Sequence, residues 1–150
     1  MFPDLTRDDV FRLETRRLWL RWPRQADAAA IVRLAGEKAV AEMSAAIPHP
    51  YPPEEAERFV FAARQANADG RRLTLAITPR AKPGQLIGAV GISCDGPSAP
   101  FLGYWLGTPS WGSGLATEAC RGLIDAFFAY TGGGELTGSV RVINPESRRV

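Results

Sequence analysis

The sequence has few of the residues that form metal centres or disulfide frameworks. Its 150 residues include two cysteines and one histidine. Cys94 and Cys120 stand far apart without a Cys-x-x-Cys spacing, and His49 has no second histidine to join it, so neither a disulfide framework nor a Cys/His metal site can be assembled. We therefore expect both cysteines to be small core residues, and we expect no metal cofactor.

Long apolar runs and a strong charge imbalance are also missing. No segment approaches the roughly 20 apolar residues needed to cross a bilayer, and residues 1–17 lack the apolar core of a signal peptide. The 18 basic and 16 acidic side chains leave a net charge of +2, which is too small to indicate nucleic-acid binding. We therefore expect a single cytoplasmic domain, residues 1–150, without membrane or nucleic-acid partners.

Hydrophobic periodicity predicts both helices and strands. The expected strands are 18–22, 73–78, 85–94, 101–106 and 136–143, and the expected helices are 25–42, 53–67 and 112–130. Turn-forming residues at 79–84 and 95–100 separate the three central strands, which should form an antiparallel meander. Asp27 is the expected cap of the first helix, in which Gly36 could introduce a break.

One more helix is expected to begin near the end of the sequence. Asn144 suits its cap and Pro145 its first turn. Only about one turn follows before Val150, and a single turn is unstable because helix nucleation is costly. We therefore expect the domain to be truncated at its C-terminus.

The most specific segment is GYWLGTPSWGSGLATEA at 103–119. Its glycines, Gly112 and Gly114, stand between an apolar strand and the start of a long helix. Unpaired backbone N–H groups and the helix dipole can hold a phosphate there. Ala116 is too small to shield these amides, so the segment predicts a site for a diphosphate ligand.

Two common phosphate-binding patterns fit this segment poorly. A P-loop needs a Lys-Ser/Thr pair after its last glycine, where Leu115 and Ala116 stand instead. A dinucleotide-binding fingerprint would need a glycine or alanine at Thr117 and an acidic residue at the end of the next strand. Glu135 is at about the right distance but precedes its strand, and the antiparallel meander upstream also disfavours this alternative.

The segment instead resembles the acetyl-coenzyme A loop of the GNAT N-acetyltransferase family. The family motif, Arg/Gln-x-x-Gly-x-Gly/Ala, aligns with Trp111–Ala116, with tryptophan in the first position. That departure is typical of the branch of ribosomal-protein-alanine N-acetyltransferases (RimJ/RimL-like). The branch also has an early LxTxRLxLR, matched by LETRRLWLR at 13–21, and a late NxxS, matched by NPES at 144–147.

The resemblance implies an α+β fold, in which a mixed, mostly antiparallel sheet is flanked by helices and splays open between strands 101–106 and 136–143. Acetyl-CoA would be the co-substrate. Its pantetheine arm would lie along strand 101–106, and its pyrophosphate would bind the loop amides. The cofactor-binding residues that the resemblance implies are Tyr104, Trp105, Leu106, Trp111, Gly112, Ser113, Gly114, Leu115, Ala116, Asn144 and Ser147.

The implied reaction is direct transfer of an acetyl group to a primary amine of a protein N-terminus or a small molecule. Backbone N–H in the strand Tyr104–Leu106 is the expected oxyanion donor, and Ser147 the expected proton donor to the thiolate. The general base is not assigned: Glu118 is a candidate, but a glutamate in a first helical turn is more often structural. His49 either lines the acceptor pocket or is a solvated loop residue.

Other conspicuous side chains have ordinary expected roles. Trp19 and Trp22 should pack in the core or on a sheet face, and Arg16 and Arg17 should be solvated charges. A non-catalytic acyl-CoA-binding module on the same fold is the alternative function, and an exposed sheet edge would favour a homodimer.

Overall fold

The computed structural model describes residues 2–42, 47–94, 99–132 and 134–138. Five strands form one sheet in the order β1-β2-β3-β4-β5, and every neighbouring pair is antiparallel. The strands are β1 (Arg12–Glu14), β2 (Leu18–Arg21), β3 (Arg72–Pro79), β4 (Gly88–Ser93) and β5 (Phe101–Leu106). The antiparallel meander predicted from the sequence is confirmed.

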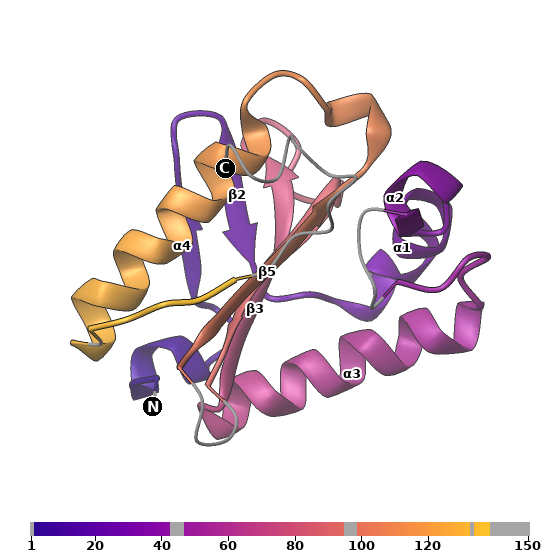
Figure 1. Ribbon diagram of the computed structural model, residues 1–150. Helices are drawn as coiled ribbons and strands as arrows, with labels where there is room; N and C mark the ends of the chain where they lie inside the picture. The colour runs from indigo at the N-terminus through magenta and orange to yellow at the C-terminus, as the bar shows by residue number, and fades with distance from the viewer. Residues whose placement is uncertain (1, 43–46, 95–98, 133, 139–150) are drawn as a thin grey trace.

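Helices cover both faces of this sheet, as Figure 1 shows. On one face lies α4 (Leu115–Thr131), and on the other lie α1 (Ala28–Ala35), α2 (Lys38–Glu42) and α3 (Pro53–Asp69). Short 3-10 turns, η1 (Asp4–Arg7), η2 (Gln25–Asp27) and η3 (Thr108–Ser110), join these elements. This arrangement is the α+β fold that the resemblance implies.

Two hydrophobic cores form because successive side chains of a strand point to opposite faces. Leu73, Leu75 and Ile77 of β3 pack against α4, where Leu123 and Phe127 are fully buried. The intervening Ala76 belongs to the second core, which contains Ile31 and Leu34 of α1 and Val60 of α3. Burying each large side chain contributes about 1.5–3 kcal/mol, so the two layers of helices hold the sheet from both sides.

The single helix expected over 25–42 is wrong, because the chain forms η2, α1 and α2 there. The second break falls at Gly36, where a Cβ would lie 2.4 Å from the carbonyl oxygen of Val32 and 3.2 Å from Cβ of Tyr51. Asp27 stands at the cap position of α1 but makes no side-chain capping hydrogen bond there. Its carboxylate instead binds Arg21 and the backbone N–H of Arg24.

Three expected boundaries also shift. β4 begins at Gly88 rather than at residue 85, and α3 continues to Asp69 before Gly70 ends it in the left-handed conformation (φ 74°). The helix expected from Gly112 begins at Leu115, because Gly112 and Gly114 have φ of 81° and 78°, which is not helical.

The end of the described chain pairs with the outer side of β5. Thr137 forms a parallel bridge with Phe101, through hydrogen bonds of 2.8 Å from Leu102 N–H to Thr137 O and from Thr137 N–H to Pro100 O. This isolated parallel bridge falls within the expected strand 136–143 and lies outside the five antiparallel strands. Most of the expected strand 136–143, and the expected helix start at 144–147, lie outside the described residues.

Candidate functional site

The glycine-rich segment forms a compact loop between β5 and α4. The indole N–H of Trp111 donates to the carbonyl of Leu106 at 2.6 Å, which folds the loop back onto the end of β5. The hydroxyl of Ser113 donates to the carbonyl of Ser110 at 3.3 Å, and Ser110 N–H donates to Gly107 O at 3.0 Å. The loop therefore has a defined shape held by its own hydrogen bonds.

Both glycines of the loop need their left-handed backbone, since other residues rarely adopt a φ near 80°. A Cβ at Gly112 would meet no described atom within 4 Å, and one at Gly114 would meet only Nη2 of Arg17, at 3.5 Å. The requirement for glycine is thus conformational, and this side of the backbone stays accessible.

The loop leads directly into the N-terminus of α4. The carbonyl of Gly114 accepts the first hydrogen bond of the helix, from Glu118 N–H at 3.0 Å. The N–H groups before Glu118 therefore have no helical carbonyl to bind, and the helix dipole adds partial positive charge at the same place. Backbone groups of 112–116 are suitably placed to bind an anion such as a diphosphate.

A network of side chains holds this loop to the turn between β1 and β2. The carboxylate of Glu118 accepts hydrogen bonds from the hydroxyl of Thr15, from the backbone N–H of Arg17 at 2.8 Å and from Nε of Arg17 at 2.7 Å. Arg17 also donates from Nη1 to the carbonyl of Ser113 at 2.9 Å. One guanidinium therefore joins the start of α4 to the glycine loop.

This network determines the role of Glu118. Burial alone would raise the pKa of its carboxyl, but hydrogen bonds from Thr15 and Arg17, together with the charge of Arg17, lower the pKa below its ordinary value. A carboxylate with a lowered pKa and three donors is poorly suited to take a proton from an ammonium. What the structure shows for Glu118 is a carboxylate that joins the start of α4 to the β1–β2 turn.

The expectation that Arg17 is a solvated charge is wrong. Its side chain is only 38% exposed and is paired with Glu118. Thr15, Arg17 and Glu118 all stand inside the recognised motifs. Nothing in either motif, however, indicates that the two segments contact each other.

The residues expected to contact pantetheine lie along β5. Leu106 is buried, Tyr104 packs against the core under α4, and Trp105 packs against the other core. Asn144 and Ser147, which the resemblance places at the cofactor, lie outside the described residues.

Segments from the α1–α3 side meet the loop at the end of β5. Thr108 donates its hydroxyl to the carboxylate of Glu37 at 2.7 Å, and Leu34 packs against Gly107, where a Cβ would meet its side chain at 3.0 Å. His49 Nδ1 lies 2.6 Å from the carbonyl of Gly36, in the segment between α1 and α2. The contact of Glu37 with the loop was not predicted, because no sequence motif distinguishes this residue from other carboxylates at helix ends.

Two further kinds of chemistry lack a basis in the described part of the chain. No cluster of three or more His, Cys, Asp or Glu side chains that could hold a metal ion occurs there. Burial raises the pKa of the Cys120 thiol to about 12, which disfavours the thiolate form that a nucleophile needs. Within the same residues, no helix is long and apolar enough to span a membrane.

An antiparallel meander followed by a glycine loop and a helix N-terminus gives an α+β protein with a backbone site suited to an anionic group. The sequence over residues 17–150 matches the family model of the acetyltransferase (GNAT) domain. The chain therefore belongs to the GNAT acetyltransferases, which use acetyl-CoA as co-substrate, and the family resemblance seen in the sequence is confirmed.

Solved structures of acetyltransferases share this fold. RimJ of Mycobacterium smegmatis, in complex with CoA-disulfide, is 22% identical, with a TM-score of 0.76 over 93% of this chain and 70% of that chain. An acetyltransferase from Salmonella typhimurium that modifies the N-terminal serine of the ribosomal protein L7/L12 is 18% identical, with a TM-score of 0.76 over 92% and 80%. The microcin C7 self-immunity acetyltransferase MccE, in complex with acetyl-CoA and AMP, is 19% identical, with a TM-score of 0.76 over 90% and 76%. No curated protein sequence matches the chain.

Proposed function

We propose that this acetyltransferase transfers the acetyl group of acetyl-CoA directly to a primary amine, and that its acceptor is the α-amino group of a polypeptide. The observation that carries the proposal is the glycine loop, whose accessible backbone leads into the first turn of α4. Similar structures include RimJ with a coenzyme A disulfide and an enzyme that modifies an N-terminal serine, which favours a polypeptide acceptor. We place the reaction in the cytoplasm.

The described residues suggest how the co-substrate is held. Backbone N–H groups of 112–116 bind the pyrophosphate, while Arg17 holds the loop through Ser113 O. The pantetheine arm lies along Tyr104–Leu106 of β5, as an added strand would. We also propose that Asn144 binds this arm, because it stands at the asparagine of the family motif.

In the reaction, the amine attacks the acyl carbonyl of the thioester. A C–N bond forms and the C–S bond breaks, and the leaving thiolate then needs a proton. A backbone N–H of Tyr104–Leu106 is our candidate donor to the developing oxyanion. Ser147 is our candidate proton donor to sulfur. Because Glu118 is tied to Arg17, a different group or a bound water takes the proton from the ammonium.

The cofactor part of the proposal is tested by calorimetry with coenzyme A and acetyl-CoA. A Gly114→Trp variant places a bulky side chain at a left-handed position of the loop, and we expect its affinity to fall at least about tenfold. Gly84→Trp is the matched control, since Gly84 lies in an exposed turn where a Cβ would meet nothing within 4 Å. Equal binding by the parent and by a folded Gly114→Trp variant would reject the loop as the cofactor site.

The catalytic part needs a separate measurement. Release of free thiol from acetyl-CoA is followed with a set of peptides that have a free N-terminus and with the same peptides blocked by N-acetylation. Thiol release that requires the free α-amine supports the proposal. Tight coenzyme A binding without turnover on any amine would instead favour the non-catalytic acyl-CoA-binding module. The expected homodimer is checked independently by sedimentation equilibrium.

A further inference from the structure

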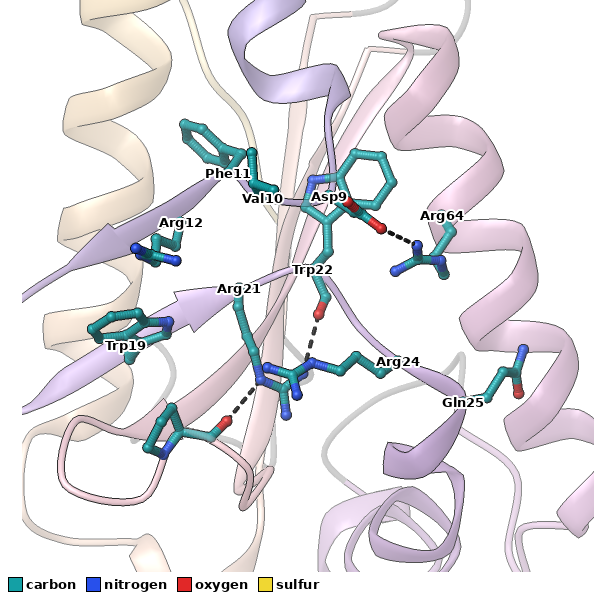
Figure 2. Close-up of a pocket in the computed structure, with 11 residues that line it drawn as sticks. Asp9, Val10, Phe11, Arg12, Trp19, Arg21, Trp22, Arg24, Gln25 and Arg64 are labelled. Carbon is teal, nitrogen blue, oxygen red and sulfur yellow. Dashed lines mark hydrogen bonds and ion pairs between the residues drawn. The ribbon is translucent and has the colours of Figure 1, made fainter.

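A hollow of about 670 Å³ opens on the α1–α3 face of the sheet, at the end of the β1–β2 hairpin away from the glycine loop (Figure 2). Arg12 and Arg21 face each other across the two strands there, whereas the turn at Thr15–Leu18 is at the other end. The hollow exists because α1 and α3 pack mainly on β3, β4 and β5 and leave this end of the hairpin uncovered.

The inner wall of the hollow is built from arginines whose charges are already neutralised. Arg21 is bound to both carboxylate oxygens of Asp27, at 2.9 and 2.8 Å, and donates from Nε to the carbonyl of Pro83 at 2.7 Å. Arg64 is bound to Asp9 at 2.7 Å and lies 5.2 Å from the ring centre of Trp22. The positive charges of this wall are therefore already paired with carboxylates.

The rim differs from the wall. Arg12 and Arg24 are both exposed, and within the described residues no carboxylate pairs with either guanidinium. The neighbouring acids are committed elsewhere, Asp9 to Arg64, Asp27 to Arg21 and Glu14 to Arg80. The hollow therefore carries two positive charges that no described carboxylate neutralises.

The contact of Arg12 with Trp19 leaves its guanidinium oriented to bind an anion. Its guanidinium stacks over Trp19, with 4.6 Å between Cζ and the ring centre. Stacking holds the flat face of the group while the N–H donors along its edge remain available for a bidentate carboxylate. In Figure 2, the Arg12–Trp19 pair and the Asp9–Arg64 pair lie on opposite sides of the hollow, with Arg24 between them.

The chemistry of the lining selects among anions. Nucleic acid binds through many phosphates, commonly 6–10 contacts, and two unpaired arginines are too few. A compact doubly charged phosphate would lie near Asp9, which also lines the hollow. Carboxylate side chains spaced along a polypeptide can each meet one of the two arginines, and apolar residues between them suit the side chains of Val10 and Trp19, which also line the hollow.

We propose that this hollow is a binding site for an acidic polypeptide segment, with Arg12 and Arg24 each binding a carboxylate and Trp19 supporting Arg12. The site is separate from the glycine loop. Its occupation does not require acetyl transfer, so the proposed function and this site can fail independently.

The test measures binding of a fluorescein-labelled, N-acetylated peptide rich in aspartate and glutamate by anisotropy at low salt. We expect the double variant Arg12→Gln/Arg24→Gln to bind at least tenfold more weakly than the parent. The control Arg33→Gln/Arg121→Gln removes the same charge at exposed positions outside the hollow and should change binding less than twofold. Arg12→Lys/Arg24→Lys keeps the charge but loses the bidentate edge, and should give an intermediate loss.

Several outcomes would overturn the proposal. Equal weakening by the hollow variant and the control would mean that only net charge matters. Displacement of the peptide by inorganic phosphate at equal concentration would indicate a small-anion site, and tighter, hollow-dependent binding of single-stranded RNA would indicate a nucleic-acid site. Circular dichroism and coenzyme A binding check that each variant is folded.

Discussion

Two arginines of one hairpin each pair with a carboxylate, and their surroundings give the pairs different roles. Arg21 and Asp27 have side chains only 5% and 3% exposed, whereas Arg17 and Glu118 are 38% and 16% exposed. The sealed pair, Arg21–Asp27, joins the sheet to the start of α1, and the open pair, Arg17–Glu118, joins the β1–β2 turn to the glycine loop. The same ionic chemistry therefore serves the fold at one end of the hairpin and the site at the other.

The degree of burial explains why the two ion pairs differ in their contribution to stability. Removing one partner of a buried pair leaves an uncompensated charge and costs about 3–5 kcal/mol, while a solvated pair contributes about 0–1 kcal/mol. Arg17 gains its importance from geometry, since its remaining donor binds the carbonyl of Ser113 in the loop.

Breaking the sealed pair should have the largest effect. Asp27→Ala should lower the free energy of unfolding by about 3–5 kcal/mol, because Arg21 is left buried and the N–H of Arg24 loses its acceptor. Urea denaturation followed by circular dichroism measures this. The apolar double variant Arg21→Met/Asp27→Leu should be less destabilised than Asp27→Ala, and a loss below 1 kcal/mol for Asp27→Ala would contradict the interpretation.

Breaking the open pair should affect the cofactor more than the fold. Arg17→Gln should lower stability by about 1 kcal/mol, and we expect about a tenfold increase in the KM for acetyl-CoA with kcat nearly unchanged. The reason is that the glycine loop loses its tether while the reacting groups stay in place. Arg16→Gln, at the exposed neighbouring position, is the matched control and should leave both constants as they are.

Removing the supporting hydroxyl should have a smaller effect. Thr15 donates to Glu118 and accepts from Leu18 N–H at 3.0 Å. Thr15→Val keeps the shape but loses these hydrogen bonds, so unfolding should become about 0.5–1.5 kcal/mol easier. Thermal denaturation tests this, and a variant as stable as the parent would show that Arg17 alone holds Glu118.

The smallest effect should be on the pH dependence of stability. Because the folded-state pKa of Glu118 is lowered, its ionised form stabilises the fold above the ordinary glutamate pKa of about 4.3. This stabilisation is lost as the pH falls through the lowered value. The difference in unfolding free energy between the parent and Glu118→Gln should therefore shrink from pH 6 to pH 3, and a constant difference would contradict the assigned role.

Particular residues show how far prediction from the sequence could go. The strand at Leu18–Arg21 and the loop at Gly112 and Gly114 were predicted, because alternation and glycine spacing are local signals. Within 25–42 the break at Gly36 was anticipated, but the 3-10 turn at Gln25–Asp27 was not, since the pairing of Asp27 with Arg21 forms only on folding. The pairing of Arg17 with Glu118 was missed because the two residues are 101 positions apart. The roles of Asn144 and Ser147 stay predictions.

The sequence by itself determined most strands, the two long helices and the position of the glycine loop, because periodicity, turn residues and the conformational freedom of glycine act over a few neighbouring residues. Its motifs also indicated the family. Tertiary structure alone decided which arginines are neutralised. Arg21 and Arg17 meet carboxylates of η2 and α4, whereas Arg12 and Arg24 lie where the described helices do not cover the sheet. The free energy of each charge depends on burial and on its partner, and only the folded chain supplies both.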